Sequence, residues 1–124
     1  MMMRLFIILA GAFGFLAVAL GAFGAHGLQK IVAPEQLAVW HTGVQYQMYH
    51  SLALLAVALL ALSYINPVIA GWAGWAFVIG ILLFSGSLYA IVVLGIRNLG
   101  LITPIGGVFF LIGWILLAVA AIKK

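Results

Sequence analysis

Four long apolar stretches, separated by short polar segments, dominate the hydrophobic pattern of this chain. A helix rises 1.5 Å per residue, so about 20 apolar residues are enough to cross the hydrocarbon core of a bilayer. On this basis we predict transmembrane helices over residues 5–26, 44–64, 67–95 and 104–122. The expected fold class is an all-α membrane protein, a single domain over residues 1–124 with its helices in an antiparallel bundle.

The second stretch is the least apolar, because its uninterrupted apolar part runs only from Leu52 to Leu62. It reaches bilayer length only if residues 44–51 also lie within the membrane or its headgroup layer. In the long connection before it, Pro34 predicts the start of a short interfacial helix between the first and second spans. Trp40 suits the headgroup region, and Gly43 is a place where that helix could bend.

Two later spans begin with a capping residue followed by proline. Asn66 precedes Pro67, and Thr103 precedes Pro104. Asparagine and threonine side chains accept hydrogen bonds from free N–H groups at a helix start, and proline needs no N–H there. We therefore predict that both pairs start helices, with a turn over residues 97–100 between the last two spans.

Composition supports the membrane prediction. The chain has 124 residues, 69% of them hydrophobic and 5% charged, whereas soluble domains carry about 25% charged residues. The net charge of +4 comes from bases scattered at the edges of apolar stretches, so no basic patch for nucleic acid is expected. Cysteine is absent, which excludes disulfides and thiolate metal sites.

The bases also predict an orientation. With four spans, Arg4, Lys123 and Lys124 lie on one side of the membrane, and Lys30 and Arg97 lie on the other. Because positive residues favour the cytoplasmic side, we expect both termini to face the cytoplasm from the cell (inner) membrane.

Small residues are spaced for close helix packing. The first span carries a seam of small residues at steps of three or four, and the third and fourth spans add further pairs: Ala10, Gly14, Ala17, Gly21, Gly24, Ala25, Ala70, Gly74, Gly106 and Gly113. Small side chains let helix backbones approach closely, which holds helices together where lipid removes the hydrophobic driving force.

Polar side chains gather in one half of the predicted bundle, around His50. Thr42, Tyr46, Tyr49, His50 and Ala53 follow each other at steps of three and four, so they share one helical face, with Gln45 beside it. Lipid cannot satisfy such groups, so we predict a polar pocket in one leaflet. Its candidate ligand-binding residues are His26, Gln45, Tyr46, Tyr49, His50, Ser85, Ser87, Tyr89, Arg97 and Thr103.

Three roles are open for these residues. They could hydrogen-bond across helices and set the packing, bind a lipid, quinone or other amphiphile, or handle protons through His50. No catalytic residue, metal site or cofactor is assigned, because the three histidines have no nearby acid or thiol and the single acid, Glu35, lies in a loop.

Four segments together carry a resemblance that spans nearly the whole chain: residues 21–27 (GAFGAHG), 42–52 (TGVQYQMYHSL), 83–89 (LFSGSLY) and 102–107 (ITPIGG). They resemble the signature stretches of the domain of unknown function 423 family of small inner-membrane proteins. That family includes YgdD- and YwdK-type proteins and is similar to transmembrane protein 256. The resemblance implies four transmembrane helices and brings no established activity.

The sequence therefore favours a binding or accessory protein of the membrane, acting as a homo-oligomer or as a small subunit of a larger complex. The alternatives are a small oligomeric transporter or channel and, less favoured, an intramembrane enzyme that uses His50.

Overall fold

The computed structural model describes residues 1–124 and contains helices and loops but no strand. The elements are α1 (Met2–His26), the 3₁₀ helix η1 (Leu28–Lys30), α2 (Pro34–Leu60), α3 (Pro67–Gly80), the π-helix η2 (Ile81–Ser85), α4 (Gly86–Leu94), the 3₁₀ helix η3 (Arg97–Leu101) and α5 (Thr103–Ile122). Because α3, η2 and α4 follow without a break, they form one long helical segment.

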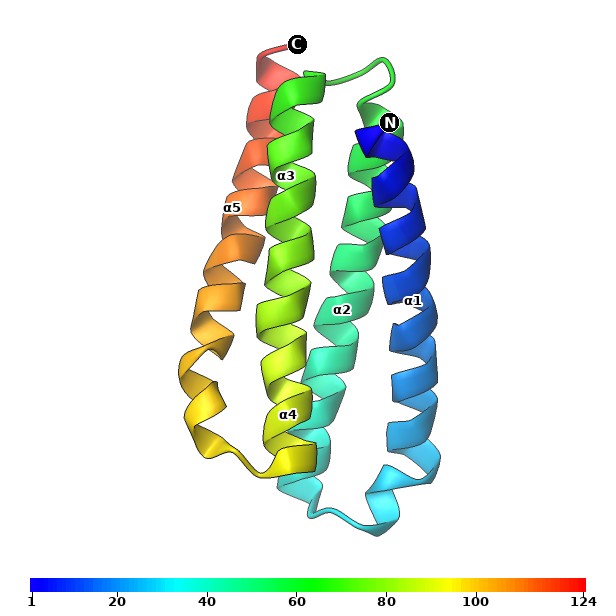
Figure 1. Ribbon diagram of the computed structural model, residues 1–124, viewed down its shortest axis with the longest axis vertical. Coiled ribbons are helices and arrows are strands. Elements are labelled where there is room, and N and C mark those ends of the chain that lie inside the picture. The colour runs from blue at the N-terminus through cyan, green and yellow to red at the C-terminus, as the bar shows by residue number, and fades with distance from the viewer.

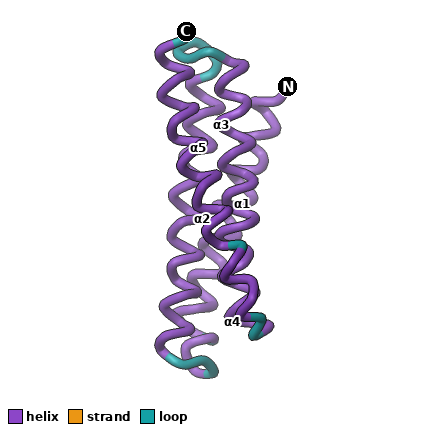
Figure 2. Tube along the Cα trace, turned by 90° about the vertical axis from the view of Figure 1, so that its left-hand side faces the viewer, coloured by secondary structure: helices purple, strands orange, loops and turns teal.

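The long helical segments lie side by side in an elongated, flattened molecule (Figures 1 and 2). In Figure 1 their order across the molecule is α5, α3 with α4, α2 and α1, so α1 and α5 lie at opposite edges. Both termini and the α2–α3 connection lie at one end, and the α1–α2 and α4–α5 connections lie at the other.

Three helical segments are long and apolar enough to cross a membrane: Met2–Lys30, Pro67–Leu94 and Arg97–Ile122. The segment α2 is also long, but polar side chains from Gln45 to Ser51 lower its hydropathy. The structure thus supports an all-helical membrane protein and singles out α2 as the exceptional segment.

The helix starts follow the sequence signals only in part. Asn66 caps α3 as predicted, since its side-chain oxygen accepts hydrogen bonds from the N–H groups of Val68 and Ile69. Thr103 is instead the first residue of α5 and makes no such cap, because its hydroxyl group pairs with Ser87. No separate short helix lies between η1 and the second long helix, because α2 itself begins at Pro34 and runs unbroken through Gly43.

Aromatic rings packed on glycines join neighbouring segments. A Cβ atom on Gly74 would lie 2.2 Å from the ring of Phe6, and one on Gly80 would lie 2.4 Å from the ring of Phe110. On Gly113 it would lie 2.6 Å from the ring of Phe77. Because a side chain at these positions would overlap a ring, only glycine lets the rings approach so closely.

The seam of small residues predicted on α1 is confirmed at Ala10, Ala17 and Gly24, which are all buried. Gly21 lies against Val44, but Gly14 would have no atom within 4 Å of an added Cβ. Gly14 therefore lies outside the packed face and borders the groove between α1 and α2. Fewer small residues of α1 pack against a neighbouring helix than the spacing predicted.

The π-helix η2 brings α5 unusually close. A Cβ atom on Gly106 would lie 2.4 Å from the backbone nitrogen of Phe84, which lies within η2. A π-turn inserts an extra residue into an α-helix and often marks a functional or tightly packed position. Here it places Phe84 against α5 and Ser85 against α2.

Candidate functional site

Gln47 on α2 links three helices through its amide group. Its Nε2 donates to the carbonyl oxygen of Phe13 on α1 (2.8 Å), and its Oε1 accepts from the hydroxyl group of Tyr89 on α4 (2.6 Å). The hydroxyl group of Ser51 donates in turn to the carbonyl oxygen of Gln47 (2.6 Å). Gln47 is only 3% exposed, so these bonds supply partners that lipid cannot offer.

A second link joins α2 to the α3–α4 segment at Gly43. The hydroxyl group of Ser85 donates to the carbonyl oxygen of Gly43 (2.6 Å). The ring of Tyr89 also packs on this glycine, since a Cβ there would lie 2.8 Å from the ring. Gly43 therefore does not bend the helix, and its small size lets Tyr89 reach Gln47.

His50 is held by partners on both ring nitrogens. Its Nδ1 lies 2.7 Å from the carbonyl oxygen of Tyr46, and its Nε2 accepts from the indole N–H of Trp114 on α5 (3.0 Å). A carbonyl only accepts and an indole N–H only donates. The ring is therefore neutral, with its proton on Nδ1, and it stacks on Phe110 at a centroid distance of 3.6 Å.

Two further hydrogen bonds join helices in this half of the molecule. The hydroxyl groups of Ser87 and Thr103 pair at 2.5 Å and connect α4 to α5. The indole N–H of Trp40 donates to the carbonyl oxygen of Leu20 (2.9 Å) and connects α2 to α1. Polar groups here thus satisfy one another or the backbone.

The structure separates the ten predicted site residues into two groups. His50, Ser85 and Ser87 are buried, and Tyr89 and Thr103 are half-buried and hydrogen-bonded to the network. The other five are exposed: His26, Gln45, Tyr46, Tyr49 and Arg97.

The face of α2 that is buried in the structure therefore differs from the predicted polar face by a rotation about the helix axis. The buried polar face runs through Gly43, Gln47, His50 and Ser51, whereas Tyr46 and Tyr49 lie outside it. Steps of three and four also connect the observed face, so spacing alone could not choose between the two. The buried face contains Gly43, where the ring of Tyr89 packs, and this contact with another helix goes with the observed rotation.

Sequence reasoning missed three participants: Gln47, Ser51 and Trp114. Gln47 is four residues after Gly43, a small residue that marks the packed face and was a usable signal. Trp114 is 45% exposed and carries a polar group only at its indole nitrogen. Nothing in its sequence position pointed to His50, which lies 64 residues earlier.

Four residues of the hydrogen-bonded network line cavities: Gln47, Ser51, Ser87 and Tyr89. Tyr89 and Gln47 border a cavity of about 190 Å³ between α1 and α4, whose other lining is Phe13, Leu16, Leu20, Ile81, Leu82 and Gly86. Ser87 borders a cavity of about 230 Å³ next to η3. A third cavity, of about 280 Å³, follows the α1–α2 groove past Gly11 and Gly14.

No group of three or more His, Cys, Asp or Glu side chains lies close enough to hold a metal ion. The polar contacts join uncharged donors and acceptors, and the five bases lie apart from them. The geometry of this region is that of a neutral hydrogen-bonded network bordered by a small, mostly apolar cavity.

Comparison with known proteins places the chain in a family. The model of a protein family described as "Protein of unknown function (DUF423)" matches residues 20–107, which include the hydrogen-bonded network of α2 and α4. This chain belongs to the DUF423 family. Its curated relatives carry the name UPF0382 membrane protein, so the chain is a membrane protein of an uncharacterised family.

The family likeness extends over almost the whole chain. It is 56% identical over 123 residues to the UPF0382 membrane protein YwdK of Bacillus subtilis, covering 98% of both chains. It is 50% identical over 121 residues to the UPF0382 membrane protein SAB0533 of Staphylococcus aureus, again covering 98% of both. A UPF0382 membrane protein of Staphylococcus epidermidis is 46% identical over 121 residues, again covering 98% of both chains. No solved structure matches the chain.

Proposed function

We propose that this chain spans the cell (inner) membrane four times, with antiparallel helices and cytoplasmic termini. The doubtful span is α2, and its 27 residues would extend about 40 Å, more than the roughly 30 Å of a hydrocarbon core. The buried side chains of Gln47, His50 and Ser51 all have hydrogen-bond partners, so inserting this part of α2 into lipid would leave none of these three unpaired. The excess length supports an interfacial position for its first two turns, from Pro34 to Trp40.

Orientation can be tested with single cysteines, since the chain has no native thiol. A cysteine replacing Lys30 should react with a membrane-impermeant maleimide in intact cells. A cysteine replacing Lys124 should react only after the membrane is opened. The reverse labelling pattern would contradict the proposed orientation.

Within this topology, we propose that the chain acts as a binding or accessory protein for a membrane amphiphile. The observation that supports this is the cavity between α1 and α4, where apolar side chains surround two polar ones, Gln47 and Tyr89. Ligand sites commonly combine an apolar lining with a few placed polar groups. At about 190 Å³ the cavity would hold part of an acyl or isoprenoid chain, with the remainder in lipid.

The two polar groups retain hydrogen-bonding capacity toward a ligand. The amide nitrogen of Gln47 has a second N–H, and the hydroxyl oxygen of Tyr89 has lone pairs that can accept. A ligand hydroxyl or carbonyl group fits this pair, as in a lipid, a quinone or another oxygen-bearing amphiphile. Both nitrogens of His50 are engaged, which favours binding over acid–base catalysis at this residue.

Native mass spectrometry from mild detergent tests the proposal. Gly86 lines this cavity and the neighbouring one at Ser87, and an added Cβ there meets no atom within 4 Å, so Gly86→Leu should narrow the cavity. The matched control is Gly11→Leu, which fills the α1–α2 groove instead. We expect a co-purified ligand mass on the wild-type protein and on Gly11→Leu, and its loss from Gly86→Leu.

Two outcomes would contradict this function. The first is recovery of bare wild-type protein after extraction under several mild conditions. The second is an equal ligand load on Gly86→Leu, which would place the ligand elsewhere. In either case the exposed apolar faces of α1 and α5 would favour a purely accessory role in a homo-oligomer or larger membrane complex.

A further inference from the structure

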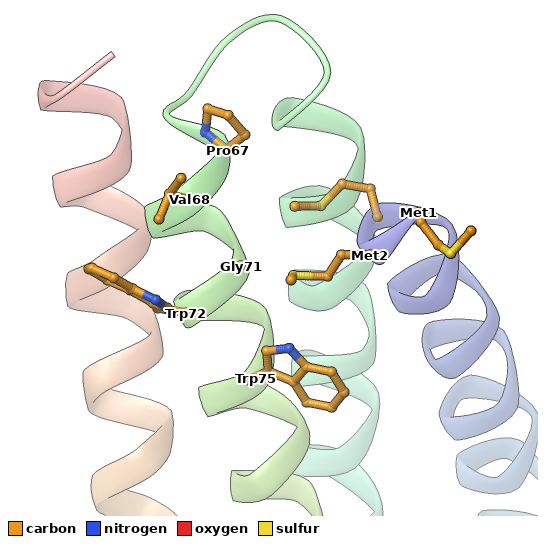
Figure 3. Close-up of a pocket in the computed structure, with 8 residues that line it drawn as sticks. Met1, Met2, Pro67, Val68, Gly71, Trp72 and Trp75 are labelled. Carbon is orange, nitrogen blue, oxygen red and sulfur yellow. The ribbon is translucent and has the colours of Figure 1, made fainter.

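A larger cavity lies at the opposite end of the molecule, near the termini. Its volume is about 350 Å³, and its lining comes from the starts of α1 and α3: Met1, Met2, Met3, Pro67, Val68, Gly71, Trp72 and Trp75. Figure 3 shows Met2 extending toward α3 near Gly71, with Trp75 deeper along the same helix. This cavity shares no residue with the Gln47–Tyr89 region.

The walls of this cavity suit an apolar chain. The sulfur atom of Met2 packs on Gly71, where an added Cβ would lie 2.9 Å away. Methionine is flexible and polarisable, so it adapts to chains of different shape. Below it, the ring of Trp75 meets the ring of Phe6 edge-on at 5.4 Å and closes the cavity toward the centre of the molecule.

Three basic residues, Arg4, Lys123 and Lys124, lie at the same end of the molecule as the cavity. Arg4 directly follows the three methionines. On the other side, the ammonium group of Lys124 donates to the carbonyl oxygen of Ser63, and the Asn66 side chain donates to the carbonyl oxygen of Lys123 (3.4 Å). These bonds hold the C-terminal residues against the α2–α3 connection, which leads into the cavity-lining Pro67.

No acidic side chain offsets these bases. The single carboxylate side chain, Glu35, lies in the first turn of α2, at the opposite end of the molecule. Trp72 is 59% exposed next to the cavity, and tryptophan favours the level of the lipid headgroups. An apolar cavity that opens among bases at headgroup level matches a molecule with an apolar tail and an anionic head.

We propose that this cavity binds one acyl chain of an anionic phospholipid from the surrounding bilayer, with its headgroup among Arg4, Lys123 and Lys124. Anionic lipids interact favourably with basic residues next to the membrane, and each lysine strengthens binding about fivefold. The proposal is independent of the ligand proposed for Gln47 and Tyr89, because the two cavities lie at different ends.

Photo-crosslinking in lipid nanodiscs tests it. The probes are phosphatidylglycerol and phosphatidylcholine, each with the same diazirine-bearing acyl chain, at low fraction in phosphatidylcholine discs. We expect phosphatidylglycerol to label the peptides containing Met1–Arg4 and Pro67–Trp75 about fivefold more than phosphatidylcholine does. Filling the cavity with Gly71→Leu or, at its more exposed rim, Val68→Trp should remove this excess.

The contribution of the basic residues has a matched control at the other end of the molecule. The double variant Lys123→Gln/Lys124→Gln should bring labelling by phosphatidylglycerol close to that by phosphatidylcholine. The double variant Lys30→Gln/Arg97→Gln removes the same charge and should leave it unchanged. Equal labelling by the two lipids would overturn the proposal, as would an excess that survives Val68→Trp. Crosslinks between two copies of the chain at these peptides would assign the cavity to a protein partner instead.

Discussion

The two pairs of helices in this molecule, α1 with α2 and α3 with α5, are held together by different means. Between α1 and α2, side chains such as Trp40 and Gln47 donate hydrogen bonds to backbone carbonyl oxygens of the opposite helix. Between α3 and α5, aromatic rings lie on glycines, as Phe110 does on Gly80 and Phe77 on Gly113.

The difference shows two solutions to one physical problem. In lipid, apolar side chains gain little by leaving their solvent, so helices need either close packing or interhelical hydrogen bonds. The α3–α5 pair uses the first and contains almost no polar side chain. The α1–α2 pair combines both, because Trp40 also packs on Gly24, and its hydrogen bond from Gln47 places an amide group in α2.

The largest effect is expected from breaking the close packing. Gly106→Ala would place a Cβ 2.4 Å from the backbone nitrogen of Phe84, and backbone cannot move aside as a side chain can. We expect a loss of about 3 kcal/mol or more in the free energy of unfolding, measured by SDS titration in mixed micelles.

The neighbouring variant Gly107→Ala is the matched control, because its Cβ would lie 3.9 Å from the Phe84 ring. It should leave the unfolding transition almost unchanged. A Gly106→Ala protein as stable as Gly107→Ala would show that α5 and η2 do not approach as closely as described.

A smaller effect is expected from breaking the hydrogen bonds. Gln47→Leu removes the bonds to the Phe13 carbonyl and from the Tyr89 hydroxyl group. Interhelical hydrogen bonds in membranes average about 0.6 kcal/mol each, so we expect a loss of roughly 1–2 kcal/mol in the same assay. The exposed Gln45→Leu should be neutral, and equal effects of the two variants would contradict the observed rotation of α2.

The smallest effect concerns the unpacked side of α1. Gly14→Ala meets no atom within 4 Å, so it should be neutral or stabilise the protein by up to about 1 kcal/mol through helix propensity. Gly24→Ala, on the same helix but 2.8 Å from the Trp40 ring, should destabilise it. Destabilisation by Gly14→Ala would mean that another helix occupies the α1–α2 groove.

The sequence predicted features that depend on local chemistry. Asn66 and Pro67 start a helix by capping, and Ala10, Ala17 and Gly24 form a packed seam because of their size. The spacing of polar residues could not show which of two adjacent faces of α2 is buried, because both faces run at steps of three and four. Tyr46 and Gln47 are neighbours, and the choice between them depends on the position of Gly43 against Tyr89, which is set by another helix.

The π-helix was equally out of reach. Residues 81–85 continue the apolar pattern of α3, and no proline or glycine lies among them. The wider turn is favoured by contacts made by its neighbours, Gly106 on α5 and the Gly43 carbonyl on α2. Such tertiary contacts leave no periodic signal in the segment that adopts them.

The direction of the hydrogen bonds between α1 and α2 makes the two helices unequal in how they tolerate substitution. The donors are side chains on α2, Trp40 and Gln47, whereas the acceptors on α1 are backbone carbonyl groups of Leu20 and Phe13. Every amino acid presents the same carbonyl group, so α1 can change its side chains at these two positions and keep both bonds. The identity of these two hydrogen bonds is encoded on α2 alone, whereas α1 contributes to the contact through the small size of Gly24 against Trp40.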